Sequence, residues 1–176
     1  MRNSTVENIQ EHSHMVAVVA HALAIIRRDI FGETCDPNEI AAAALFHDAS
    51  EIFTGDMPTP IKYFDPDIMS AYKRIESLAS KKLLYSLPGK LRASYEPLLS
   101  DSEDNTTSKL IKAADTLTAY IKCKEELKAG NLEFQLAAQQ TQAKLAELNM
   151  PEVNYFMEHF IPAFELTLDE LDFNFE

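Results

Sequence analysis

Tryptophan is absent from this sequence, and glycine and cysteine are scarce, with four and two copies in 176 residues. The two cysteines, Cys35 and Cys123, are too few for the disulfide framework that stabilises many small secreted proteins. They do not form a CxxC pair, which excludes a thiolate zinc knuckle. We therefore expect free thiols and a cytoplasmic protein.

Long apolar runs are also missing. The longest uncharged run, Met15 to Ile26, has 12 residues and is interrupted by His21, whereas a membrane span needs roughly 20. Asn3, Glu7 and Glu11 stand where a signal peptide would have its apolar core. The sequence predicts neither a membrane span nor a signal peptide.

Basic residues are few, 16 against 28 acidic residues, and the formal net charge is −12. A surface with this charge repels phosphate polymers, so we expect no nucleic acid partner. A small phosphate ligand would need a local source of positive charge, either a metal ion or a helix N-terminus.

Helix-forming residues, by contrast, are abundant. Long stretches consist of Ala, Leu, Lys, Glu and Gln, and no segment alternates apolar and polar residues for the length of a strand. The length suits one domain over residues 1–176 with a sizeable core. We predict an all-α bundle of six or seven helices. They are expected near residues 9–31, 37–54, 66–86, 91–99, 110–129, 132–148 and 151–160, with one more turn after residue 167.

The informative feature is a set of ionisable residues on helix faces that should be apolar. His12 shares a stripe with Val16, Val19 and Leu23 on the first predicted helix. On a later helix, Asp115 lies among apolar and small residues. Two side chains that can carry charge are therefore expected to point inward from different helices.

The second predicted helix carries three more ionisable residues. His47 and Asp48 follow the apolar run Ala41 to Phe46, and Glu51 comes at i+4 from His47 and i+3 from Asp48. On a continuous helix this spacing places all three side chains on one side.

Burying isolated charges costs several kcal/mol each unless they are paired or bound to a metal. A buried salt-bridge network is one solution, but the nearest cations, Arg27, Arg28 and Lys112, fall off the apolar stripes. A divalent cation is the other solution. Two imidazoles and two carboxylates suit manganese, cobalt, iron or zinc better than calcium. We predict one such ion, bound by His12, His47, Asp48 and Asp115.

These residues also carry a resemblance. The order His12, His47-Asp48, Asp115 is similar to the metal signature of the HD-domain phosphohydrolase superfamily. The surrounding sequence resembles the bacterial HD-domain 5′-deoxynucleotidases at residues 11–13, 47–51, 54–64 and 112–115. The likeness extends through residues 127–131 and 155–157. The Gly-Asp-x-Pro-Thr-Pro segment from Gly55 is more specific than the metal pattern alone.

The resemblance implies an HD-domain fold and a cytoplasmic homodimer. It implies a metal-dependent enzyme that removes the 5′-phosphate from deoxyribonucleoside 5′-monophosphates. Asp48 and Asp115 would then border the substrate as well as the metal. Glu51, one turn from the His-Asp pair, is suited to deprotonate the attacking water or to pass that proton to the leaving oxygen.

The loop that follows is expected to bind the nucleoside. By resemblance, Asp56 accepts a hydrogen bond from a sugar hydroxyl, while Met57, Pro58 and Thr59 line the nucleoside side. Lys62 is a weaker candidate for a phosphate contact.

This sequence departs from the family pattern at one point, and two alternative functions remain open. The family usually begins one helix earlier, with an Arg-Trp pair that contacts phosphate and sugar, and this sequence starts after that point. We therefore expect weak discrimination against ribonucleotides.

One alternative function is that of another HD-domain nucleotide phosphohydrolase or phosphodiesterase. The absence of histidine between Asp48 and Asp115 disfavours the two-metal enzymes of this kind. The other alternative is a catalytically impaired module that binds metal or nucleotide.

Overall fold

The computed structural model describes residues 3–4, 7–57, 61, 64–99 and 105–170. Within these ranges every regular element is helical and no strand occurs, which confirms the all-α expectation. In chain order the elements are α1 (Ile9–Asp29), α2 (Pro37–Ala44), α3 (Glu51–Thr54), α5 (Pro66–Ser86), α6 (Gly89–Leu99), α7 (Thr106–Lys128), the 3₁₀ turn η1 (Leu132–Phe134), α8 (Gln135–Glu147), α9 (Pro151–His159), α10 (Ile161–Glu165) and the 3₁₀ turn η2 (Leu168–Glu170).

Side-chain caps fix where several helices begin. The Asn8 side chain accepts hydrogen bonds from the backbone N–H groups of Gln10 and Glu11, and the Glu11 carboxylate accepts the Asn8 N–H, which forms a capping box. Asp36 and Asp65 each cap a helix whose first residue is proline. These two predicted starts are confirmed.

The predicted extent of the second helix, residues 37–54, is wrong in a way that matters for function. It ends at Ala44, and residues 45–50 form successive turns before α3 begins at Glu51. The turns are closed by hydrogen bonds to the residue three positions back, such as His47 N–H to the Ala44 carbonyl at 3.3 Å. His47, Asp48 and Glu51 therefore do not share one face of a continuous α-helix.

Two other boundaries also differ from the prediction. α7 begins at Thr106 rather than Leu110, because the Asn105 side chain caps it by accepting the Ser108 N–H at 2.7 Å. The chain continues past Phe160 into α10, where Pro162 occupies an early helical position that needs no N–H.

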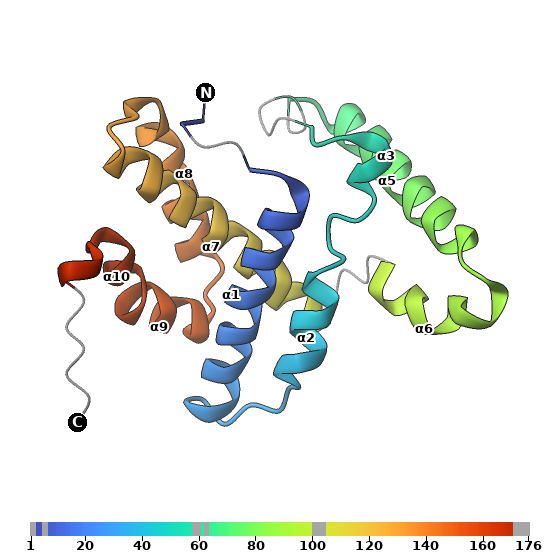
Figure 1. Ribbon diagram of the computed structural model, residues 1–176, viewed down its shortest axis with the longest axis horizontal. Coiled ribbons are helices and arrows are strands. Elements are labelled where there is room, and N and C mark those ends of the chain that lie inside the picture. Colours follow the sequence, from blue (N-terminus) through green and yellow to red (C-terminus); the bar gives the residue numbers. More distant parts are fainter. Residues whose placement is uncertain (1–2, 5–6, 58–60, 62–63, 100–104, 171–176) are drawn as a thin grey trace.

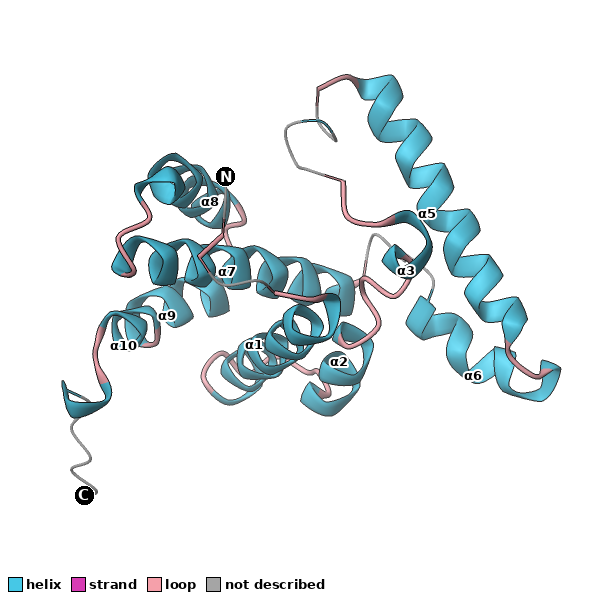
Figure 2. Ribbon diagram, turned by 45° about the horizontal axis from the view of Figure 1, so that its top comes forward, coloured by secondary structure: helices cyan, strands magenta, loops and turns pink. Residues whose placement is uncertain are grey.

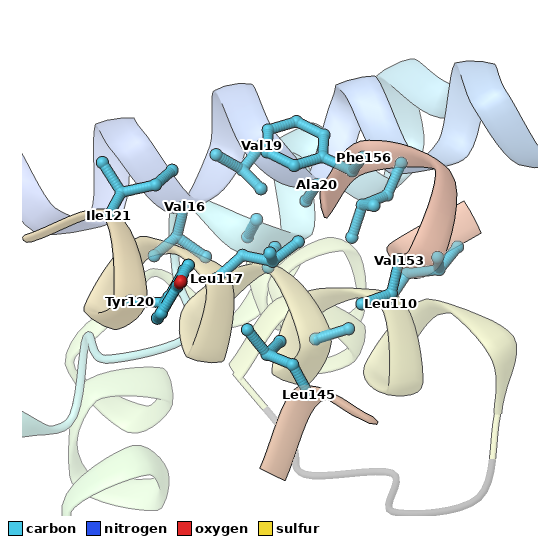
Figure 3. Packing of buried hydrophobic residues seen from close by; sticks show 14 of the residues in the cluster. Val16, Val19, Ala20, Leu110, Leu117, Tyr120, Ile121, Leu145, Val153 and Phe156 are labelled. Atoms are coloured by element: carbon cyan, nitrogen blue, oxygen red, sulfur yellow. The ribbon is translucent and has the colours of Figure 1, made fainter. Parts of the chain in front are cut away.

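The core lies where α1 crosses α7, with α2, α8 and α9 around them (Figure 1). Figure 3 shows Val16 and Ala20 of α1 facing Leu117 of α7, with Leu145 of α8 and Val153 of α9 completing the cluster. All five side chains are almost fully buried. This packing fixes α1 relative to α7, the two helices that carry His12 and Asp115.

α1 is the one described helix long and apolar enough to cross a membrane by length and composition. Its apolar side is buried in the core, where Val16, Ala20 and Leu23 have no exposed surface. Burial against α7 accounts for the apolar character of α1.

α5 and α6 lie to one side of this core, and α3 packs against α5 (Figure 2). α6 reaches back to α2. The turns that carry His47 and Asp48 therefore run from the core, at the end of α2, to the α3–α5 layer.

Candidate metal centre

Four of the predicted site residues converge from three separate segments. His12 comes from the first turns of α1, Asp115 from the middle of α7, and His47 and Asp48 from the turns after α2. His12 Nε2 lies 3.1 Å from Asp115 Oδ1 and 3.6 Å from Asp48 Oδ2. Asp48 Oδ2 lies 3.0 Å from His47 Nε2. These four side chains thus face a common point at the junction of the three segments.

The spacing of these groups fits a single cation. His12, His47 and Asp115 each offer one ligand atom, and these atoms lie within 4.8 Å of one another. Asp48 adds a carboxylate oxygen that contacts both histidines. The His12 and His47 rings are tilted by 45°, with centroids 5.4 Å apart. All four side chains are partly buried, so each keeps some surface exposed to solvent.

His47 is the residue whose environment most clearly requires a cation. The Ala44 carbonyl lies 2.8 Å from its Nδ1 and can only accept a hydrogen bond, so it holds a proton on that nitrogen. A neutral His47 then presents the lone pair of Nε2 to the Asp48 carboxylate, which also can only accept. Nε2 is buried, and among the described residues it has no hydrogen-bond partner of acceptable geometry. A proton or a metal ion at this nitrogen removes the mismatch, so these residues fit a bound metal.

Electrostatics in the metal-free protein point the same way. The hydrogen bond with Asp115 raises the pKa of His12 above its ordinary value of 6.5, despite opposing burial. Burial lowers the pKa of His47, but the contact with Asp48 and its negative charge outweigh this and leave the pKa raised. Each histidine is therefore held by a carboxylate that favours a positive charge at the site.

The nearest basic side chain on α1 does not compensate this negative charge. Arg27 lies at the far end of the helix, where its guanidinium donates a 2.8 Å hydrogen bond to the fully buried Glu152 carboxylate of α9. This pair joins α9 to α1, so Arg27 does not neutralise the carboxylates of the cluster.

The structure places Glu51, Asp56 and Met57 along α3 and directly after it. Glu51 is half-buried at the start of α3, and its backbone N–H donates to the Asp48 carbonyl at 2.9 Å. Asp56 is exposed and Met57 half-buried, directly after Gly55 ends α3. Pro58, Thr59 and Lys62 lie outside the described residues.

Sequence reasoning did not identify Tyr72. This α5 residue is buried, and its hydroxyl donates a 2.9 Å hydrogen bond to the Gly55 carbonyl, 17 positions away in sequence. Its position on α5 carries no signal of this role, because the contact depends on how α5 packs against α3.

Comparison with known proteins gives a consistent result over nearly the whole chain. The family described as 5′-deoxynucleotidase YfbR-like matches residues 1–164. A 5′-deoxynucleotidase of Photorhabdus laumondii is 51% identical over 172 residues, covering 97% of this chain and 87% of that protein. A 5′-deoxynucleotidase of Vibrio parahaemolyticus is 49% identical over 172 residues, covering 97% and 89%.

The architecture also matches a solved structure. An HD-domain phosphohydrolase from Listeria innocua superposes with a TM-score of 0.80 at 24% identity, covering 93% of this chain and 79% of that one. At this identity the likeness concerns the fold, and it confirms the expected HD-domain architecture.

Proposed function

This chain belongs to the YfbR-like 5′-deoxynucleotidase family, and from that premise we propose how its residues remove the 5′-phosphate from deoxyribonucleoside 5′-monophosphates. Residues 1–176 act as one HD domain. The observation that carries the proposal is the convergence of His12, His47 and Asp115 on a space small enough for one ion, with Asp48 against both histidines.

His12, His47, Asp48 and Asp115 would hold one divalent transition metal ion. Their mixture of imidazole nitrogen and carboxylate oxygen suits cobalt, manganese, iron or zinc. When bound, such an ion neutralises charge on a phosphate dianion and lowers the pKa of a coordinated water. Asp48 and Asp115 border the same space, so they also delimit where the substrate phosphate binds.

Glu51 is the proposed proton carrier. Water attacks phosphorus in line with, and opposite to, the 5′ oxygen. The Glu51 carboxylate takes the proton from that water and delivers it to the departing 5′ oxygen. Its half-buried position three residues after Asp48, with its backbone N–H donating to the Asp48 carbonyl, supports this role. General acid–base catalysis of this kind typically contributes about 10²- to 10⁴-fold.

The segment after α3 is proposed to bind the nucleoside. Asp56 accepts a hydrogen bond from the sugar hydroxyl, and Met57, Pro58 and Thr59 line the side of the nucleoside. Lys62 is a further candidate for the phosphate. The continuity of Asp56 with α3, which begins at Glu51, supports this arrangement.

We also propose that the enzyme is a cytoplasmic homodimer paired through α5. The exposed residues Ala71, Ile75, Leu78, Lys82 and Tyr85 follow the alternating spacing of four and three that lets one helix pack along another. Ile75, Leu78 and Tyr85 are 51%, 65% and 65% exposed. A stripe of this spacing is complementary to the same stripe of a second copy. The free thiols of Cys35 and Cys123 support a reducing compartment.

Phosphate release tests the proposed reaction. The purified chain is supplied separately with cobalt, manganese, iron(II) and zinc, and then with matched deoxy- and ribonucleoside monophosphates, a cyclic nucleotide and a deoxynucleoside triphosphate. We expect phosphate from the deoxynucleoside monophosphates. Nucleotide binding without release under all four metals would favour a binding module, and release from the cyclic or triphosphate substrate alone would favour another HD-domain hydrolase.

A mass measurement in solution tests the dimer. Leu78→Glu places a charge on the α5 stripe and should convert the dimer to a monomer, while Lys73→Glu, elsewhere on the same helix, should leave the mass unchanged. A monomeric wild-type protein at micromolar concentration would contradict the dimer without touching the proposed reaction.

A further inference from the structure

The Gly55 carbonyl is the anchor point of the segment that leads to Asp56. α3 has only four residues, closed by the Gly55 N–H donating to the Glu51 carbonyl at 2.8 Å. A helix this short has little stability of its own, so contacts with its neighbours must set its orientation. α3 packs against α5, and the hydrogen bond from the Tyr72 hydroxyl to the Gly55 carbonyl spans this interface.

Gly55 adopts a backbone conformation that other residues avoid. Its φ of 66° and ψ of 166° lie in a region open essentially to glycine alone. No heavy atom lies within 4 Å of the position a Cβ would take, so conformation and not crowding requires glycine here. The chain therefore leaves α3 in a direction that depends on this one residue and on what holds its carbonyl.

Two hydroxyl groups hold that carbonyl. The Tyr72 hydroxyl donates at 2.9 Å, and the Thr54 hydroxyl donates at 3.0 Å. Tyr72 is 4% exposed, while most of α5 is exposed or half-buried, so the ring is fixed by packing. A buried tyrosine brings its hydroxyl to a defined point, and a buried hydroxyl needs a hydrogen-bond partner.

Fixing this carbonyl also fixes the start of the next residue. The peptide group is planar, so the Gly55 carbonyl, the Asp56 N–H and the Asp56 Cα lie in one plane. Asp56 is exposed, and packing does little to orient its side chain. The direction of the Asp56 carboxylate therefore depends on the orientation of the Gly55–Asp56 peptide.

We propose that Tyr72 is a positioning residue for substrate recognition: its hydroxyl holds the Gly55 carbonyl and thereby aims Asp56 at the sugar hydroxyl of the nucleotide. The inference rests on the proposed function, in which Asp56 contacts the sugar. A deoxyribonucleoside 5′-monophosphate has a single free sugar hydroxyl, the 3′-OH. Tyr72 thus acts on selectivity for this group through Asp56, without contacting the substrate.

The test compares two substrates on the same metal-loaded preparations. kcat/KM is measured for a deoxynucleoside 5′-monophosphate and for the 2′,3′-dideoxy compound with the same base, which lacks only the 3′-OH. The variants are Tyr72→Phe, Asp56→Ala and, as a control, Tyr155→Phe, a half-buried tyrosine of α9 outside both the site and the α5 stripe. The ratio of the two kcat/KM values is independent of the fraction of enzyme that is folded and active.

We expect the wild-type ratio to exceed one and Asp56→Ala to bring it close to one. Tyr72→Phe should lower the ratio about 3- to 10-fold, the effect of one neutral hydrogen bond, with little change for the dideoxy substrate. In the double variant Tyr72→Phe/Asp56→Ala, the ratio should equal that of Asp56→Ala alone, because Tyr72 acts through Asp56. Tyr155→Phe should leave both values unchanged.

A Tyr72→Phe variant that loses the same factor on both substrates, or that keeps the wild-type ratio, would overturn the inference. An unchanged ratio in Asp56→Ala, with hydrolysis intact, would overturn both the sugar role of Asp56 and the inference about Tyr72, but not the reaction at the metal centre. Failure of the wild-type protein to hydrolyse the deoxynucleotide under any of the four metals would instead overturn the proposed function itself.

Discussion

His12 Nε2 and Asp115 Oδ1 lie 3.1 Å apart although 103 positions separate the two residues in sequence. Packing of α1 against α7 produces this contact. Val16, one turn after His12, faces Leu117, two residues after Asp115, in the core (Figure 3). His12 and Asp115 are therefore attached to the helices of the core, while His47 and Asp48 reach the cluster through the turns after α2. We expect the geometry of His12 and Asp115 to be the more rigid half of the site.

Replacement of His47 by alanine should abolish stoichiometric metal binding. The Nε2 atom of His47 is buried beside Asp48, and its loss removes a nitrogen ligand. Elemental analysis of the purified protein should give about one transition metal ion per wild-type chain and much less per His47→Ala chain. His14→Ala is the matched control, since His14 is exposed on α1. Equal metal content in wild type and His47→Ala would rule out this ligand set.

Replacement of Glu51 by alanine should separate catalysis from metal binding. The variant should keep its metal and its melting temperature but lose about 10²- to 10⁴-fold in kcat, because proton transfer is removed. Glu39→Ala, at an exposed position of α2, should keep the wild-type rate. A Glu51→Ala enzyme with more than about half of the wild-type rate would remove Glu51 from the mechanism.

Metal binding and pH should be coupled through the two histidines. In the metal-free protein the pKa values of His12 and His47 are raised above 6.5. A raised folded-state pKa contributes stability that is fully present below about pH 6.5 and is lost as the pH rises through the folded pKa. A bound metal displaces these protons, so its affinity rises over the same pH range.

Melting temperatures with chelator and with saturating metal test this coupling. The difference between the two melting temperatures should widen as the pH rises from 5.5 to 8, and His12→Asn should make it less dependent on pH. A difference that stays constant with pH, or that narrows, would contradict proton displacement at these histidines.

The Arg27–Glu152 ion pair should be a principal stabilising contact outside the site. Glu152 has no exposed surface, so Arg27→Met leaves a buried carboxylate without its partner. We expect a loss of about 3 kcal/mol in the free energy of unfolding, measured by urea denaturation. The exposed Arg28–Asp29 pair is the control, and Arg28→Met should have a much smaller effect on the free energy of unfolding, because solvent screens this pair. Similar losses for the two variants would contradict the assignment.

Local signals in the sequence predicted a large part of the fold. The helix starts predicted at residues 37 and 66, each a proline that follows an aspartate, are the starts of α2 and α5, and apolar periodicity placed α1 and α7. The end of α2 at Ala44 could not be predicted, because residues 45–50 contain neither glycine nor proline. Tertiary contacts there override helix propensity and turn His47 and Asp48 toward the core.

The candidate site, like the fold, could be predicted in part from the sequence. His12, His47, Asp48 and Asp115 stand out as ionisable groups on faces expected to be apolar, and the cost of burying their charges joined them into one predicted metal site. The spacing argument for Glu51 assumed a continuous helix that the structure does not have. The link from Tyr72 to Gly55 depends on the packing of α5 against α3, which no local pattern encodes.

A metal titration of the stripped enzyme tests the central claim most directly. Protein freed of metal by a chelator is titrated with cobalt or manganese while phosphate release from a deoxynucleoside 5′-monophosphate is followed, for wild type and for Asp115→Ala. We predict no release without metal, a wild-type rate that saturates at about one equivalent per chain, and no saturation at that point for Asp115→Ala. Full activity in the stripped protein, or the same titration curve for both proteins, would contradict a catalytic metal centre built from these residues.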